Sequence, residues 1–159
     1  MRSVGSKGVV IRNGFTDRTP LTVTLSAYET PHGWAYGLLL QIPELVSRAL
    51  PEGGIVMFRT TSGEIVEFKQ TLPEHVSRDY VGQWIEGSAS KIYYNSGAYL
   101  ADLDGLSKLS EGVAKVRIQT SDSYIDIEYK KERWGKAMTE MLGELQASIE
   151  SGADIRSGF

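Results

Sequence analysis

Cysteine is absent from the 159-residue chain, and histidine occurs only twice. The missing thiol excludes disulfides, thiolate catalysis, iron–sulfur clusters and cysteine-based zinc sites. The two histidines, His32 and His75, do not stand in H-E-x-x-H or any other metal-ligand spacing. Glycine-rich phosphate loops and nucleophile elbows are missing as well. We therefore expect no metal and no cofactor, and the sequence favours a non-catalytic protein over an enzyme.

An excess of positive charge is also lacking, because 17 Lys and Arg residues are balanced by 20 Asp and Glu residues. Such a chain has no broad positive field to neutralise a phosphate backbone, so nucleic acid is not expected as a partner. No segment approaches the ~18 continuous apolar residues of a membrane span, and no apolar run of signal-peptide length follows the basic start. We expect no membrane span and no signal peptide, and take the cytoplasm as the default location.

What the sequence does contain is an ordinary globular composition, with 41% hydrophobic and 23% charged residues. A chain of this length can bury one proper core but hardly two. We therefore expect residues 1–159 to form a single domain. The small, polar, glycine-containing ends at 1–7 and 151–159 are expected to be flexible.

The clearest secondary-structure signals lie between Gly112 and Glu150. Apolar and polar residues alternate along 114–119 and 124–130, which predicts a hairpin with one face turned inward. From about Lys131 the apolar residues recur with the period of an amphipathic helix. The predicted inward stripe of this helix is Trp134, Ala137, Met138, Met141, Leu142, Leu145 and Ile149.

Shorter signals fill the rest of the chain. Strands are predicted at 9–11, 21–26, 34–42, 55–61, 64–69, 83–85, 91–94 and 98–101, and a helical turn at 43–49. Asn95-Ser96-Gly97 has turn composition, and Asp102 suits the N-cap of a short helix. Together these elements predict an α+β fold. It has a mainly antiparallel sheet, or two packed sheets, of about seven to nine strands, with the C-terminal amphipathic helix packed on one face.

Two of the predicted hairpins have similar sequences. Residues 54–59 (GIVMFR) and 112–117 (GVAKVR) align, and each leads through a polar turn to a strand ending in Glu, an aromatic residue and Lys. The segments 54–69 and 112–130 are either a duplicated unit or hairpins that converged on one pattern, because inward and outward positions have the same demands in both. The first hairpin has no helix of its own, so we expect a partner to bind there.

The stretch GVAKVRIQTSDSYIDIEYKKERWGKAM follows a short segment of spaced leucines. It resembles the C-terminal part of a loose group of uncharacterised bacterial proteins that share a G-V-x-K-V-R-I-x-T strand, an E-Y-K-K strand and a final helix. The resemblance covers roughly the last third of the chain, and its motifs are structural. It implies the hairpin-and-helix architecture and no activity for any residue.

Aromatic residues gather in the middle of the sequence. Exposed aromatic residues on strands anchor protein partners or stack on sugars, although in a sheet they also serve as core. The residues that we select as binding candidates are Trp34, Tyr36, Trp84, Tyr93 and Tyr94. The leading hypothesis is a non-catalytic interaction module that binds a protein or associates with itself.

Two alternatives stay open. In a small hydrolase, His32 or His75 would act as a base with a carboxylate such as Glu74 or Asp79. In a carbohydrate-binding protein, Trp34, Trp84 or Tyr93 would stack on sugar rings. A carboxylate pair formed by Asp126 and Glu128 on one strand face is also conceivable, but a charged outer sheet face explains these two residues better.

Overall fold

A computed structural model describes residues 2–13, 20–44, 50–70, 80–85 and 88–151, with the side chains of residues 80–93 outside the description. The strands are β1 (Ser3–Gly5), β2 (Val9–Ile11), β3 (Leu21–Thr30), β4 (Gly33–Glu44), β5 (Ile55–Thr60), β6 (Ile65–Lys69), β7 (Tyr80–Ile85), β8 (Ser88–Ala101), β9 (Val113–Gln119) and β10 (Tyr124–Glu128). The helices are α1 (Leu103–Leu109) and α2 (Trp134–Glu150).

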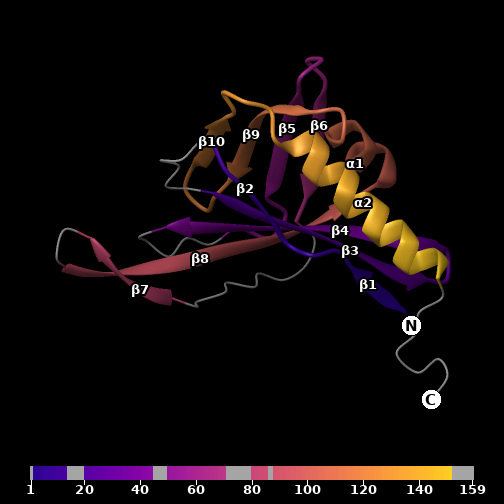
Figure 1. Ribbon diagram of the computed structural model, residues 1–159, viewed down its shortest axis with the longest axis horizontal. Coiled ribbons are helices and arrows are strands. Elements are labelled where there is room, and N and C mark those ends of the chain that lie inside the picture. Colours follow the sequence, from indigo (N-terminus) through magenta and orange to yellow (C-terminus); the bar gives the residue numbers. More distant parts are fainter. Residues whose placement is uncertain (1, 14–19, 45–49, 71–79, 86–87, 152–159) are drawn as a thin grey trace.

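The described strands form one ten-stranded sheet in the order β1-β3-β4-β8-β6-β5-β9-β10, with β2 paired to β3 and β7 to β8. All of these pairings are antiparallel. One residue pair, Lys69 with Leu100, links β6 to β8, and β5, β6, β9 and β10 run across β3, β4 and β8 (Figure 1). The α+β class and the mainly antiparallel sheet are confirmed. The alternative of two packed sheets is not confirmed, because the hydrogen-bonded order is continuous.

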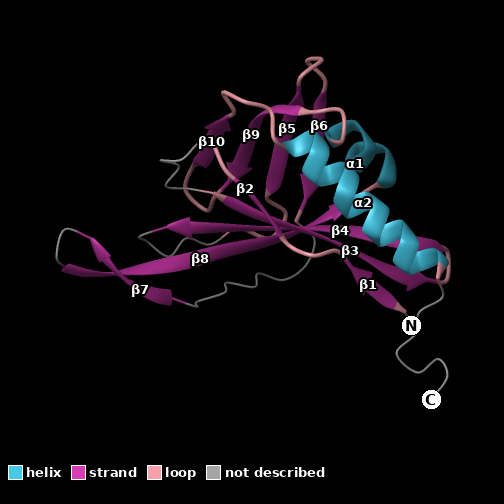
Figure 2. Ribbon diagram, viewed as in Figure 1, coloured by secondary structure: helices cyan, strands magenta, loops and turns pink. Residues whose placement is uncertain are grey.

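The core lies where the two helices meet the sheet. Helix α2 contacts β1, β2, β3 and α1, while α1 contacts β5 and β6, and Figure 2 shows both helices at one side of the molecule. The indole of Trp134 is fully buried, and its ring centroid lies 5.2 Å from that of Phe58. No helix within the described ranges is long and apolar enough to cross a membrane.

The stripe predicted for the C-terminal helix is confirmed. Five of its side chains are buried and two are half-buried against the core: Trp134, Ala137, Met138, Met141 and Leu145, then Leu142 and Ile149. The helix begins at Trp134 rather than near Lys131. Burial of the seven side chains stabilises the fold because each large apolar group removed from water contributes about 1.5–3 kcal/mol before entropy is counted.

The two similar hairpins lie beside each other in the sheet. Alternate apolar side chains of the first hairpin are buried: Val56, Phe58, Val66 and Phe68. Strand β5 pairs with β9, and Phe58 stands directly opposite Val116, the residue at the corresponding position of the second hairpin. This register relates the hairpins by a local pseudo-twofold axis through that pair. Gene duplication as the origin of the similarity stays a prediction.

The N-terminal residues make contacts that the sequence pattern does not predict. Residues Ser3–Gly5 pair with β3 as strand β1. The guanidinium of Arg2 donates to the carbonyl oxygens of Ser148 (3.0 Å) and Ile149 (3.2 Å), where a helix C-terminus favours positive charge. The backbone N–H of Lys7 donates to the Glu144 carboxylate at 3.0 Å. These contacts with α2 are long-range and leave no sequence pattern. At the other end, residues 152–159 lie outside the described residues.

The turn predicted at residues 95–97 is wrong. Asn95-Ser96-Gly97 is not a turn but part of the single long strand β8, which replaces the two short strands predicted at 91–94 and 98–101. Asn95 is 1% exposed and pairs with β4. A Cβ on Gly97 would lie 2.9 Å from atoms of Leu50 and Tyr99. Gly97 is therefore needed for close packing rather than for chain reversal.

The helical turn predicted from Pro43 is replaced, in its first two residues, by strand. Pro43 and Glu44 end β4, where they pair with Tyr94 and Tyr93 of β8. The rest of the predicted turn, residues 45–49, lies outside the described residues. Proline at the end of a strand is compatible with a sheet because the ladder loses only one donor there.

Two helical glycines should respond to alanine in opposite ways. A Cβ on Gly143 would meet nothing within 4 Å, whereas a Cβ on Gly105 would lie 2.8 Å from the buried Phe68 ring. Gly143→Ala is expected to raise the free energy of unfolding by about 0.5–1 kcal/mol through helix propensity. Gly105→Ala is expected to lower it by about 1–3 kcal/mol through overpacking. Urea unfolding measures both, and equal shifts in the two variants would contradict the packing at Gly105.

Candidate interaction face

Two of the predicted binding aromatics, Trp34 and Tyr36, have a structural role. Both side chains are half-buried and pack against the hydrophobic core from β4. The Arg2 guanidinium lies 5.2 Å from the Trp34 ring centroid, so the indole supports the cation that holds the C-terminus of α2. This contact gives the indole at position 34 a structural role, and its selection as a binding residue stays a prediction.

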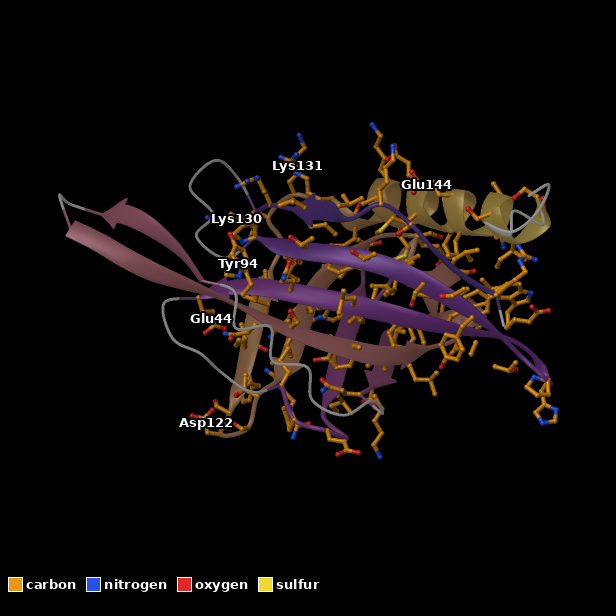
Figure 3. The ribbon with its side chains drawn as sticks, turned by 90° about the horizontal axis from the view of Figure 1, so that it is seen from below. Glu44, Tyr94, Asp122, Lys130, Lys131 and Glu144 are labelled. Carbon is orange, nitrogen blue, oxygen red and sulfur yellow. The ribbon has the colours of Figure 1, made fainter. Side chains whose placement is uncertain are left out.

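The predicted aromatics do not form one cluster along β4 and β8. Tyr36 pairs with Ala101, whereas the half-buried Tyr94 pairs with Pro43 at the other end of the two strands. Seven residues of extended chain separate these positions by roughly 23 Å. Strand β7 and the start of β8 project beyond Tyr94, away from the helices (Figures 1 and 3). The side chains of Trp84 and Tyr93 lie outside the described residues.

His32 lies exposed in the turn between β3 and β4. Its backbone N–H donates to the Thr30 hydroxyl at 3.2 Å, and no carboxylate of the described residues is hydrogen-bonded or ion-paired to its imidazole. The other predicted members of a catalytic group, Glu74, His75 and Asp79, lie outside the described residues. The described part of the chain also contains no group of three or more side chains that could hold a metal ion.

A different surface is open, on the outward side of β6, β5, β9 and β10. Alternation turns three residues of each strand away from the core, and none of the twelve is buried. We call this surface the hairpin face; across the sheet its three rows are Lys69-Ile55-Gln119-Tyr124, Glu67-Met57-Arg117-Asp126 and Ile65-Arg59-Lys115-Glu128. The face mixes charged and apolar side chains, and Tyr124 and Ile65 are each 54% exposed.

The hairpin face is hollowed into two neighbouring depressions. The larger, of about 570 Å³, extends from Ile55 and Met57 to Arg117, Tyr124 and the 120–123 turn. The smaller, of about 200 Å³, lies between Met57, Arg59, Ile65, Lys115 and Arg117. They share Met57 and Arg117, so together they form a shallow groove across the sheet. Asp122 at the rim of the groove and Glu144 on α2 lie at opposite sides of the molecule in Figure 3.

The Asp126 side of the groove is held by ion pairs. Arg117 donates to both carboxylate oxygens of Asp126, from Nε at 2.6 Å and Nη2 at 2.7 Å, and its guanidinium lies 4.2 Å from the Tyr124 ring centroid. Lys115 lies 3.3 Å from Asp126 and 3.6 Å from Glu128. The hydrogen bonds from Arg117 lower the pKa of Asp126 to about 2. This network positions Arg117 and Lys115 and shows that the Asp126–Glu128 pair is part of a charged surface.

The titration of Asp126 tests this network. The folded pKa of about 2 lies below the ordinary value, so the stabilising contribution of the carboxylate is present above about pH 4 and is lost as the pH falls through about 2. Carboxyl ¹³C NMR should show a midpoint near pH 2 in the wild type. In Arg117→Met the midpoint should return toward pH 4, while Arg59→Met should leave it near 2. A wild-type midpoint near 4 would contradict the bidentate pair.

Arg59 occupies the opposite side of the smaller depression. Its guanidinium makes no ion pair or hydrogen bond with a described residue. In the β5–β9 register it stands directly opposite Lys115 and diagonal to Arg117. Like charges in such cross-strand pairs are destabilising. On the β6 side Glu67 is diagonal to Arg59 in the register, and its carboxylate makes no ion pair with a described residue. The face therefore has positive charge that its own residues do not neutralise.

The binding residues predicted from the sequence do not include Arg59, Met57 or Ile65. A usable signal existed, because Arg59 and Arg117 occupy the same position in the two similar hairpins and both follow alternation that turns them outward. Sequence alternation alone does not reveal that β5 and β9 are neighbours. Only that pairing puts Arg59, Lys115 and Arg117 side by side.

The fold and this surface define an α+β protein with an antiparallel sheet whose paired hairpins present an open, grooved and charged face. Comparison of the chain with protein-family models, with curated proteins and with solved structures found no match. The resemblance of residues 112–138 to a group of bacterial proteins stays a prediction.

Proposed function

We propose that this protein is a non-catalytic interaction module that binds a protein partner through the hairpin face. The observation that carries the proposal is the groove on this outward sheet face. Exposed Tyr124 lines its larger depression of about 570 Å³, and exposed Ile65 lines its smaller one. Interfaces use such aromatic and aliphatic anchors with a polar rim. We further infer that residues 1–159 act as one domain, in which α1 packs behind β5 and β6 and leaves the hairpin face for the partner.

Self-association through the hairpin face is the weaker form of this proposal. Two copies can stack this face with aligned strands in two symmetric ways. If the twofold axis runs parallel to the strands, between β5 and β9, Arg59 of one copy lies over Lys115 of the other. If the axis runs perpendicular to the strands, through the row that contains Met57 and Arg117, Arg117 of one copy lies over Arg117 of the other. Both arrangements oppose like charges, which costs binding energy, so a different partner is favoured.

The enzyme and carbohydrate-binding hypotheses have less support. An enzyme using His32 would need a carboxylate beside the exposed imidazole, and the residues proposed for that role, Glu74 and Asp79, are not described. The carbohydrate-binding hypothesis uses Trp34, Trp84 or Tyr93, and the side chains of Trp84 and Tyr93 lie outside the described residues. Trp34 also packs on the core. Both hypotheses stay predictions.

A display library of random extended peptides, selected on the folded protein, tests the proposed function. We expect enriched peptides whose binding is weakened by Ile65→Glu on the hairpin face. Val10→Glu is the matched control, because Val10 is a β-branched strand residue of similar exposure (48%) outside that face, and it should leave binding unchanged. Failure to enrich any peptide, or equal losses in both variants, would overturn the proposal.

A further inference from the structure

Resting on the proposed function, we propose that the hairpin face binds an extended acidic segment of a partner protein, with a partner carboxylate paired to Arg59. The acidic class follows from the charge on the groove. Of the three neighbouring cations, Lys115 and Arg117 already have ion pairs with Asp126 and Glu128. Arg59 has none with a described residue, and its guanidinium can donate two parallel hydrogen bonds to a carboxylate.

The position of Arg59 adds a reason for a bound anion. Arg59 of β5 stands directly opposite Lys115 of β9. The repulsion between these two positive charges is unfavourable while no anion lies between them. A carboxylate seated in the 200 Å³ depression between them would interact favourably with both cations. The same depression is lined by Met57 and Ile65, so an apolar side chain beside the carboxylate would also be covered.

The ion pairs on the other side of the groove add selectivity. Asp126 and Glu128 stand along β10 at the edge of the face. Their carboxylates repel an acidic segment from that edge and confine it to the Arg59 side. Glu67, diagonal to Arg59 on β6, sets the opposite limit. The segment therefore needs few acidic groups, centred on Arg59, rather than a long acidic tract.

The free β10 edge is a poorer site for such a segment. Among the described strands, β10 pairs with β9 alone. The side-chain amide of Asn13 occupies the edge near its end, where it donates to the Glu128 carbonyl and accepts from the Lys130 N–H. The segment Tyr124–Ile127 remains along this edge, and its side chains include Asp126. This short, blocked and acidic edge disfavours strand addition.

The composition of the peptides selected from the random library tests the acidic class. We expect enriched peptides to carry Asp or Glu next to an apolar residue. Fluorescence anisotropy with one such synthetic peptide should show that Arg59→Glu weakens binding at least about tenfold, as expected for loss of a charge-assisted bidentate pair. Lys136→Glu, the same change of charge on the exposed side of α2, should change binding less than about twofold.

The outcomes separate this inference from the proposed function. Neutral or basic peptides that still lose affinity with Ile65→Glu would retain the interaction module and overturn the acidic class. Acidic peptides whose affinity falls equally with Arg59→Glu and Lys136→Glu would overturn the role of Arg59. Failure to enrich any peptide would overturn both. A basic peptide selected on the Arg59→Glu variant in place of an acidic one would support direct pairing at this position.

Discussion

Replacing Trp134 with alanine is expected to lower the free energy of unfolding by about 3–5 kcal/mol, because a large aromatic side chain leaves a cavity that the core cannot close. Trp134 is fully buried, and its ring contacts those of Phe58 (5.2 Å) and Tyr129 (6.2 Å) at edge-to-face angles. It thereby joins the start of α2 to β5 and to the chain after β10. Urea unfolding followed by far-ultraviolet circular dichroism measures the loss.

Two further variants serve as comparisons for Trp134→Ala. Trp34→Ala, at a half-buried tryptophan, should cost less than half as much. Trp134→Phe should cost only about 1–2 kcal/mol, since it keeps a ring and removes an indole N–H that has no acceptor among the described residues. A loss below 1 kcal/mol in Trp134→Ala would show that the core does not depend on this contact.

Replacing Glu132 with alanine is expected to cost about 2–3 kcal/mol. One carboxylate oxygen, Oε1, accepts from the backbone N–H groups of Trp134 (2.6 Å), Gly135 (2.8 Å) and Val113 (3.1 Å). Arg133 occupies the N-cap position of α2 without a capping side-chain bond. Glu132 therefore satisfies the donors that begin the helix and also fastens the helix to β9, and its negative charge suits the helix N-terminus.

A second substitution separates the charge of Glu132 from its role as a hydrogen-bond acceptor. Glu132→Gln keeps an acceptor oxygen and loses the charge, so it should cost about 1 kcal/mol, near the ordinary size of a helix-dipole interaction. Glu140→Ala on the exposed side of α2 is the matched control and should stay within about 0.5 kcal/mol of the wild type. If Glu132→Ala unfolds at the same urea concentration as Glu140→Ala, the capping role is wrong.

Local sequence patterns predicted much of this fold. The hairpins, the N-cap at Asp102 and the inward stripe of α2 were all predictable. Strand alternation and helical periodicity indicate which side chains must be buried, whichever element they pack against. The Asp102 carboxylate accepts from the Gly105 N–H at 2.6 Å, as its position before the short helix implied. The prediction failed at Asn95-Ser96-Gly97, where the closeness of Leu50 and β4 overrides turn composition.

The candidate site was less predictable than the fold. The sequence directed attention to the central aromatics, two of which, Trp34 and Tyr36, pack against the core. It also predicted a partner at the first hairpin because no helix follows that hairpin in the sequence. In the structure α1 contacts β5 and β6, so the partner is now proposed for the outward side. The outward position of Arg59 was predictable from alternation, but its lack of an ion pair was not, because that depends on which charged residues become its neighbours. Asp126 and Glu128 instead neutralise Arg117 and Lys115.

The sequence by itself determined what each segment of this protein could be. The lack of cysteine excluded thiolate chemistry and disulfides, and alternation decided which residues of the two hairpins face outward. Only the tertiary structure decided that β5 lies against β9, that the Glu132 carboxylate accepts from the first N–H groups of α2, and that none of the twelve outward residues of the hairpins is buried. The physical reason is that these outcomes depend on contacts between residues far apart in the chain, which strand and helix periodicities do not encode.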